Sequence, residues 1–328
     1  MNLRTIKPFY LNSKKEESNT AAQQDLVEKI QRLRQGKKAI ILAHNYQRPE
    51  IQDIADFVGD SLELSLCATQ TDAKIVVFCG VNFMAETAAI LNPEKKVLIP
   101  DVNALCPMAS MLPKELVKVY RRKYPEAKIV LYINSLAEAK AYCDAVCTSA
   151  NAAEIVNRME SEVVLFGPDV NLAKYAQTKS DKKIIPIPQC GFCPVHKLFN
   201  KEGIMRLRQE YPDAEVMAHP ECDPEVWGIA NFIGSTSRMY REALTSEANR
   251  FIVATEIGLL HRLKKDRKDA VFIPAYDEAI CVNMRLHTLE KVYLCLRDEK
   301  NEVKVPPKIA SMAHKPIEFM LKTRETQR

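Results

Sequence analysis

The chain has 328 residues, of which 47% are hydrophobic and 27% charged, a composition typical of a folded globular protein. Its net charge of +5 is small for this length, and basic residues alternate with acidic ones, which argues against a nucleic-acid-binding surface. No apolar run approaches the roughly 18–20 residues of a membrane span, and residues 1–24 lack the apolar core of a signal peptide, so we expect a cytoplasmic protein with a flexible polar N-terminal arm.

The numbers of cysteines and glycines limit the kinds of functional site that we expect. In a reducing compartment the ten cysteines are better explained by metal binding, catalysis or burial than by disulfides. The nine glycines form neither a GxGxxG nor a GxxxxGK[ST] pattern. We therefore do not expect a nucleotide-binding loop of either kind.

Short apolar runs alternate with helical patterns along the whole chain. Three successive segments each begin with such a run, at residues 37–46, 127–135 and 213–221. Each of these runs ends in polar residues. Turns are predicted next, at residues 56–61, 144–149 and 231–236. Third strands are predicted at residues 73–80, 162–169 and 250–258, and fourth strands at 95–106, 182–193 and 268–281. Apolar runs without alternation are typical of parallel strands that are covered on both faces, so the sequence predicts the α/β class.

These segments repeat with a period of about 88 residues. The first strands end at positions that are 88 and 87 residues apart, namely His44, Tyr132 and His219. The fourth strands end in cysteines that are 87 and 88 residues apart, namely Cys106, Cys193 and Cys281. We interpret the repeat as three homologous α/β/α units with parallel sheets around a pseudo-threefold axis.

The repeat also predicts the domain boundaries. We expect a first unit with the N-terminal arm at 1–107, a second unit at 108–194 and a third at 195–280. A C-terminal segment, 281–328, is expected to close back onto the first unit.

Cys190 and Cys193 form a CxxC pair, for which a thioredoxin-like redox pair and half of a zinc knuckle are alternatives. A thioredoxin-like pair follows the first strand of a βαβ domain, whereas this pair ends the fourth strand of the second unit. A zinc knuckle needs a second close pair, which the sequence lacks. Only Cys193 has a counterpart in the other units, so we interpret it as the functional thiol.

Three equivalent cysteines can meet at one site, because ligands gather at the carboxyl ends of parallel strands. Three thiolates leave one metal position open, either on zinc or on a [4Fe–4S] cluster whose fourth iron acts as a Lewis acid. The alternative is that small apolar cysteines only fill the ends of strands.

Polar residues at the same strand ends and in the following turns complete the predicted site. Hydroxyls at helix starts bind anions or simply cap helices, and this group comprises Ser61, Ser149, Ser235 and Thr236. The other side chains offer proton transfer and orientation, and this group comprises His44, Tyr46, Tyr132, Asn134, His219 and Glu221. The residues alone predict a metal-assisted enzyme for small, multiply anionic substrates.

At these residues the chain resembles the quinolinate synthase family, over roughly residues 25–295. The resemblance is carried, in the family's order, by AHNYQRPEIQDIADFVGDSLELS, FCGVNFMAE, YINSLAEAKAYCDAVCTSANA, GPDVNLAKY, GFCPVH, AHPECDPEV, GSTSRM, ATEIGLLHRL and CVNMRLHTLEKVYLCL. It implies a transferase of de novo NAD biosynthesis that condenses iminoaspartate with dihydroxyacetone phosphate to quinolinate, with loss of phosphate and two waters. It also implies L-aspartate oxidase as a candidate for transient contact.

The resemblance further implies a [4Fe–4S] cluster with Cys106, Cys193 and Cys281 as its ligands. It implies catalytic roles for Tyr46, Tyr132, His219 and Glu221, with Glu221 transferring protons. It implies substrate binding by His44, Ser61, Tyr132, Asn134, Ser149, His219, Glu221, Ser235 and Thr236, and it places Met284 beside the third cysteine.

Two positions depart from the family's pattern. Gln189 stands where many members have tryptophan, and Leu105 stands where glycine is frequent. Neither change removes a ligand or a proton carrier. Seven cysteines match no ligand position, and Cys147 takes the place of Gly59 and Gly234 in the other units. Two rival functions stay open: another [4Fe–4S]-dependent hydro-lyase of a small anionic substrate, and a non-enzymatic cluster- or zinc-bearing sensor.

Overall fold

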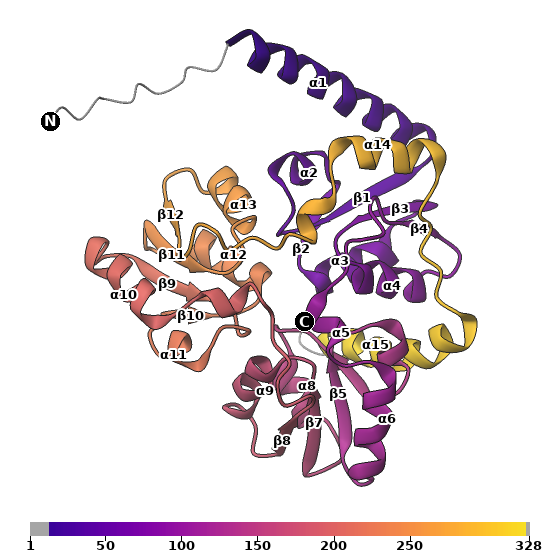
Figure 1. Cartoon of the computed structure of the whole chain (residues 1–328), viewed down its shortest axis with the longest axis vertical. Coiled ribbons are helices and arrows are strands. Elements are labelled where there is room, and N and C mark those ends of the chain that lie inside the picture. The colour runs from indigo at the N-terminus through magenta and orange to yellow at the C-terminus, as the bar shows by residue number, and fades with distance from the viewer. Residues whose placement is uncertain (1–12, 326–328) are drawn as a thin grey trace, which may run out of the picture.

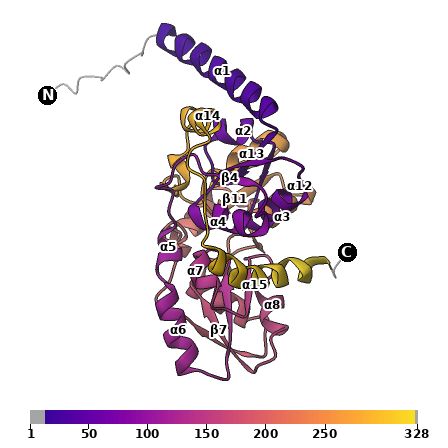
Figure 2. The ribbon, with the colours of Figure 1, turned by 90° about the vertical axis from the view of Figure 1, so that its right-hand side faces the viewer.

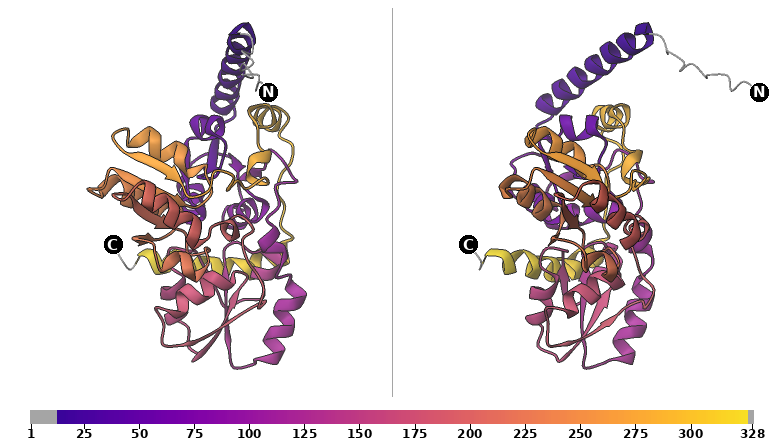
Figure 3. Two further views of the ribbon diagram at one scale, coloured as in Figure 1. Left: turned by 60° about the vertical axis from the view of Figure 1, so that its left-hand side comes forward. Right: turned by 90° about the vertical axis from the view of Figure 1, so that its left-hand side faces the viewer.

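The structure, a computed structural model, describes residues 13–325 and the side chains of residues 21–323. Residues 1–12 of the expected N-terminal arm lie outside the described part. From Ser13 on, the polar stretch that we expected to be flexible is instead helical, as the start of α1 (Ser13–Gly36). This helix packs against α14 (Leu289–Asp298), and its N-terminal half projects from the body of the molecule (Figures 1 and 3).

Three successive segments have the same order of elements. The first contains α1, β1 (Ala39–His44), α2 (Pro49–Ile54), β2 (Phe57–Gly59), α3 (Ser61–Gln70), β3 (Ile75–Cys79), α4 (Asn82–Leu91), β4 (Lys96–Leu98) and α5 (Pro107–Ser110). The second contains α6 (Lys114–Lys123), β5 (Lys128–Tyr132), α7 (Ala137–Lys140), β6 (Ala145–Cys147), α8 (Ala152–Asn157), β7 (Val163–Gly167), α9 (Val170–Gln177), β8 (Lys183–Pro186) and the 3₁₀ turn η1 (His196–Leu198).

The third segment repeats the order once more. It contains α10 (Lys201–Glu210), β9 (Glu215–Ala218), α11 (Pro224–Trp227), β10 (Phe232–Ile233), α12 (Thr236–Thr245), β11 (Arg250–Ala254), α13 (Leu259–Asp266), β12 (Val271–Pro274) and the 3₁₀ turn η2 (Met284–Leu286). The α/β fold with three repeated units is therefore confirmed, and Figure 1 shows the units arranged around a common centre. The short strands β2, β6 and β10 occupy segments that the sequence analysis treated as turns.

Each unit holds one parallel four-stranded sheet. The strand orders are β2-β1-β3-β4, β6-β5-β7-β8 and β10-β9-β11-β12, so the chain reverses its direction across the sheet beside the first strand of every unit. Ligands bind at such a switch point, outside the carboxyl ends of the strands. The register pairs His44 with Gly59 and Tyr132 with Cys147, which places Cys147 at the position of the first unit's glycine.

The strands are buried because their residues are apolar on both faces. In β3 all five residues are buried, as helices cover both sides of the sheet. Several helices begin at a side chain that accepts backbone N–H groups, such as Asp60 at α3, Asp169 at α9 and Ser235 at α12. These caps fix the helix starts that face the centre of the molecule.

The C-terminal segment contacts more than one unit. Residue 303 donates its N–H to the Val97 carbonyl oxygen (2.8 Å), and residue 302 forms an antiparallel bridge with Leu98, which covers the edge of the first sheet. The last helix, α15 (Pro307–Glu325), then packs on α4 of the first unit and on α7 and β6 of the second (Figure 2). The four-part domain division stays a prediction.

Candidate active site

A cavity of about 340 Å³ lies where the three units meet, a size typical of small-molecule sites. The structure brings to it all but one of the site residues predicted from the sequence. These lining residues are His44, Tyr46, Ser61, Cys106, Tyr132, Asn134, Ser149, Cys193, His219, Glu221, Thr236 and Cys281, together with Met284. Every unit therefore contributes one cysteine and one set of strand-end polar groups.

Ser235 is the exception, because its hydroxyl is used within the fold. It caps α12 by accepting the Arg238 N–H (3.4 Å), and it donates to Oδ2 of Asp60 (3.0 Å). Asp60 in turn caps α3, so the starts of α3 and α12 are held together across the first and third units. Substrate binding by Ser235 stays a prediction.

Hydroxyls at two helix starts do reach the cavity. Ser61 is the first residue of α3 and Thr236 the first of α12, where the helix dipole favours anions. Asn45 supports Thr236: its Nδ2 donates to Thr236 Oγ1 (2.9 Å), while its Oδ1 accepts from Arg262 (3.1 Å). In the second unit, Asn134 Oδ1 has no hydrogen-bond partner among the described residues and can accept from a ligand.

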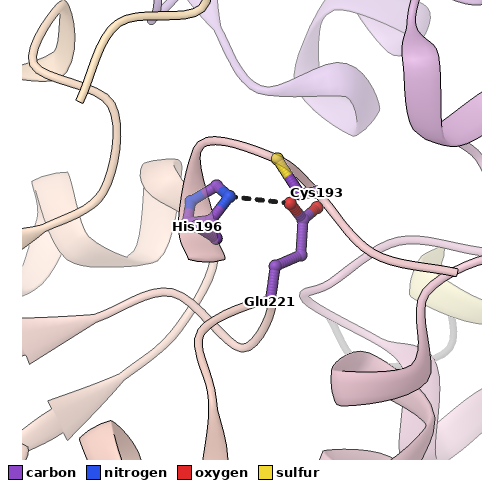
Figure 4. A group of neighbouring side chains, drawn as sticks. All are labelled: Cys193, His196 and Glu221. Carbon is purple, nitrogen blue, oxygen red and sulfur yellow. Dashed lines mark ion pairs between the residues drawn. The ribbon is translucent and has the colours of Figure 1, made fainter. Parts of the chain in front are cut away.

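Glu221 lies at the centre of the polar groups, with 3% of its surface exposed. Its Oε1 accepts from the Tyr132 hydroxyl (2.7 Å), and its Oε2 lies 2.8 Å from Nδ1 of His196, as Figure 4 shows. Burial alone would raise the pKa of Glu221, but His196, His219 and the Tyr132 hydroxyl together lower it below the usual range. Glu221 is therefore ionised at neutral pH.

The two predicted histidines are neutral. Burial lowers the pKa of His44 and of His219 to about 3 in each case. Their Nδ1 atoms accept the backbone N–H groups of Tyr46 and Glu221, both at 3.2 Å, which fixes the lone pair on that nitrogen. Each ring therefore carries its proton on Nε2.

A chain of hydrogen-bonding groups crosses the cavity from the first unit to the second. The Tyr46 hydroxyl lies 2.7 Å from Oγ1 of Thr255, which lies 3.0 Å from Nε2 of His196. From His196 the chain continues through Glu221 to Tyr132. Burial raises the pKa values of Tyr46 and Tyr132, so both phenols are protonated donors at neutral pH. The arrangement can move a proton between two sides of one bound molecule.

The three repeat-equivalent cysteines open onto this same cavity. Burial raises the pKa of Cys106 to about 12 and that of Cys193 well above its usual value, so both thiols stay protonated until a metal binds. Nearby backbone N–H groups oppose these rises in the cysteine pKa values. They belong to the second and third residues after Cys106 and after Cys281, and to the third residue after Cys193. N–H groups that point at the sulfurs are suited to thiolate ligands of a metal.

Other cysteines are placed differently. All ten are free thiols. Cys190, Gln189 and Leu105 do not belong to the described lining of the cavity; the first two are exposed, and Leu105 is 50% exposed. Cys222, which follows Glu221, is buried in the core of the third unit, where its thiol points at the Ala254 carbonyl oxygen (3.5 Å).

The ligating atoms of Cys193, His196 and Glu221 lie within 4.8 Å of one another (Figure 4). Such a group can contribute to a metal centre. His196, Thr255 and Glu256 were not predicted as site residues, although all three are buried beside or within the cavity. The available signals were the histidine that closes the CPVH segment and the polar pair that ends a strand in ATEIG.

Comparison with known proteins agrees with this geometry. Residues 28–322 match the family model described as "NadA: Quinolinate synthetase A protein". The chain belongs to this family. A quinolinate synthase of Methanocaldococcus jannaschii is 51% identical over 303 residues, covering 91% of this chain and 99% of the relative. Those of Methanothermobacter thermautotrophicus and Thermotoga maritima are 54% and 49% identical, covering 90% and 89% of this chain and 97% of each relative.

Membership of the quinolinate synthase family agrees with two broader observations. The site holds metal-ligating side chains, as a metal cofactor requires. Within the described residues, no helix has the length and apolar character needed to cross a bilayer.

Proposed function

We propose that this member of the quinolinate synthase family condenses iminoaspartate with dihydroxyacetone phosphate to form quinolinate, releasing phosphate and two waters, for NAD biosynthesis. The observation that carries the proposal is the shared cavity. Three repeat-equivalent cysteines, two helix starts suited to anions and an ionised Glu221 line it together. Both substrates are anions, and their condensation requires protons to be taken from carbon and delivered to leaving oxygens.

A [4Fe–4S] cluster fits the three cysteines better than a single ion does. Three thiolates on one zinc ion, at about 2.3 Å from it, would lie about 3.8 Å apart in a tetrahedral site. Among the described residues, Cys106, Cys193 and Cys281 do not form a group whose sulfurs all lie within 4.8 Å of one another. A wider spacing suits a cluster, in which each thiolate binds a different iron.

Cys106, Cys193 and Cys281 would hold the cluster. When bound, it supplies a Lewis acid at the iron that lacks a cysteine ligand. The polar groups around it bind and orient the substrates: the starts of α3 and α12, with Ser61 and Thr236, favour carboxylate or phosphate. Burial of the site excludes water, which strengthens these interactions and protects an imine from hydrolysis.

Glu221 takes a proton from substrate carbon, and His196 beside it stabilises the ionised carboxylate. Tyr132 and Tyr46 are protonated before the reaction, and each can give its proton to an oxygen atom that leaves as water. Because Thr255 and His196 connect Tyr46 to Glu221, the proton gained by the carboxylate can be returned on the opposite side of the substrate. His44 and His219 are neutral and donate from Nε2 to substrate oxygens without adding a charge.

The direct test is turnover by protein purified without oxygen. Iminoaspartate is generated from oxaloacetate and ammonium, dihydroxyacetone phosphate is added, and quinolinate and phosphate are measured. Equal amounts of both products are expected. Dehydration of a hydroxy-acid without release of phosphate would instead favour a hydro-lyase, and iron binding without any turnover would favour a sensor.

We also propose that the reaction takes place in the cytoplasm, where ten free cysteines stay reduced. L-Aspartate oxidase is proposed as the source of iminoaspartate through transient contact, because a free imine hydrolyses in water. Co-purification of the two enzymes, and a rate that does not fall when the free imine is trapped, would support this contact.

A further inference from the structure

The three cysteines are joined to the fold by hydrogen bonds that repeat with the units. The loops that end in them (residues 99–106, 187–193 and 275–281), here called the cysteine loops, follow the fourth strands. Just beyond each third strand, one backbone N–H donates to the carbonyl oxygen two residues before the cysteine. The pairs are Asn82 to Ala104 (2.8 Å), Val170 to Gly191 (2.9 Å) and Ile257 to Ala279 (3.1 Å).

A second repeated hydrogen bond lies beyond each cysteine. The cysteine carbonyl oxygen accepts the N–H of the residue four positions later. The pairs are Ser110 to Cys106 (3.3 Å), Lys197 to Cys193 (3.2 Å) and Arg285 to Cys281 (3.2 Å). Each cysteine thus lies between two fixed points of the backbone, with the same geometry in all three units.

The backbone N–H of the cysteine itself donates a third hydrogen bond in the first and third units. The acceptor is a side chain that follows the third strand of the unit. In the first unit, Cys106 donates to Oδ1 of Asn82 (3.3 Å). In the third unit, Cys281 donates to Oε1 of Glu256 (3.2 Å). Both acceptors therefore contact the ligand's own peptide group rather than its sulfur.

Asp169 occupies the position of Glu256 in the second unit, 87 residues before it, whereas Asn82 lies one residue further along its own unit, at the position of Val170 and Ile257. Its Oδ1 caps α9 at Leu172 (2.7 Å). Its Oδ2 is buried and has no other hydrogen-bond partner among the described residues. The second unit therefore has a carboxylate at this position without the hydrogen bond to the cysteine N–H that the other two units form.

Both acceptors are held firmly. Glu256 Oε1 also accepts from Nε and Nη2 of Arg285 (3.1 and 3.0 Å), and its Oε2 accepts from the Gly258 N–H (2.6 Å). Asn82 is the first residue of α4, and its own N–H is the one bound by the cysteine loop. An acceptor whose position is fixed can fix in turn the direction of the cysteine that donates to it.

We propose that Asn82 and Glu256 are positioning residues that orient Cys106 and Cys281 toward the metal centre. The inference rests on the proposed function, since it takes these cysteines as cluster ligands. Groups that hold a ligand in place from behind typically change metal affinity by about 10- to 100-fold when removed. Their contribution should therefore appear in how tightly iron is held, apart from any effect on the reaction.

Asn82 offers the cleanest test, because it is partly exposed and carries no charge. Asn82→Leu removes the acceptor at similar volume, whereas Asn82→Asp retains an oxygen at the same place. Asn200→Leu is the matched control, because Asn200 Oδ1 also accepts a backbone N–H, that of Gly203 (2.8 Å), but at the start of α10. The readouts are the rate of iron release to a chelator from anaerobic holoenzyme and the melting temperature of each variant.

We expect Asn82→Leu to release iron about 10- to 100-fold faster than the wild type. Asn82→Asp and Asn200→Leu should stay within about threefold of the wild-type rate, with all melting temperatures within a few degrees. The inference would be overturned if Asn82→Leu released iron at the wild-type rate, or if Asn200→Leu accelerated iron release as much as Asn82→Leu does. Either result would leave the proposed cluster intact. Wild-type protein without bound iron would overturn both.

Discussion

Replacing Glu221 with glutamine tests the proton-transfer chemistry while leaving the shape of the site unchanged. The amide has the volume of the carboxylate, and its oxygen can still accept the Tyr132 hydroxyl that lies 2.7 Å from Oε1. At the Oε2 position, however, an NH₂ group would face Nδ1 of His196. The substituted side chain cannot accept a proton from substrate or share one with His196.

General acid–base catalysis by one side chain contributes about 10²- to 10⁴-fold to a rate, or about 3 to 5 kcal/mol of barrier. We therefore expect Glu221→Gln to lower kcat for quinolinate formation by about 10²- to 10⁴-fold. The visible absorbance of the cluster and the iron content should stay at the wild-type level, because Glu221 is not among the proposed cluster ligands. Anaerobic turnover with quinolinate detection measures the first quantity, and absorbance with iron analysis measures the others.

Glu202→Gln, on the exposed face of α10, is the matched control and should leave both readouts unchanged. A Glu221→Gln enzyme that turns over at the wild-type rate would refute the role of this carboxylate. A variant that loses its iron would show instead that Glu221 belongs to the metal centre.

Three further perturbations address the other parts of the account. Replacing His219 with glutamine should reduce the loss of stability between pH 7 and pH 5 by about 2 kcal/mol, measured by denaturant titration at each pH. Gly191→Ala should lower the melting temperature and the iron content, because its Cβ would lie 1.9 Å from a backbone carbonyl oxygen, whereas Gly36→Ala, with nothing within 4 Å, should do neither. Asn45→Leu removes the buried hydrogen bond to Thr236 (2.9 Å) and should cost about 1–3 kcal/mol of stability while raising the KM for at least one of the two anionic substrates.

The sign of the pH effect follows from the direction of the shift. The pKa of His219 is about 3 in the folded protein, against about 6.5 in an unfolded chain, so the unfolded state binds more protons between these values. The stability that the neutral ring contributes is complete above pH 6.5 and is lost as the pH falls toward 3. An unchanged pH dependence in the variant would contradict burial of a neutral ring.

The other two perturbations have their own contrary outcomes. Equal melting temperatures for Gly191→Ala and Gly36→Ala would mean that the cysteine loop does not pack as closely on Pro168 as the structure has it. An unchanged KM in Asn45→Leu would show that Thr236 does not contribute to substrate binding.

The sequence predicted those parts of the fold and site that repeat. The spacing of about 88 residues identified the three cysteines and the ends of the first strands, because equivalent backbone positions recur at a fixed distance along the chain. Strands as short as β10, with two residues, leave no such pattern and were treated as turns. The order of elements in each unit therefore needed the structure.

The repeat also concealed residues whose chemistry differs between units. His196 lies three residues after Cys193, where the other two units have Ala109 and Met284, so the alignment gave it no weight. Thr255 likewise stands where the other units have small or cyclic residues. Their roles depend on side chains that meet in space, at 2.8 to 3.0 Å from His196, and not on position within the unit.

Ser235 illustrates a third limit of the sequence. A hydroxyl at a helix start suits both an anion site and a helix cap, and the residue type is the same in either case. Only the contacts with Asp60 and Arg238 reveal that the Ser235 hydroxyl is already used in the fold.

The central claim is that one cysteine from each unit holds a shared iron–sulfur cluster. Iron and acid-labile sulfide analysis of anaerobically purified protein tests it most directly, with the Cys193→Ser and Cys190→Ser variants measured alongside. We predict about four irons and about four sulfides per chain in the wild type and in Cys190→Ser, and loss of both with the brown absorbance in Cys193→Ser. Stoichiometric zinc in place of iron, or loss of the cluster in Cys190→Ser but not in Cys193→Ser, would contradict it.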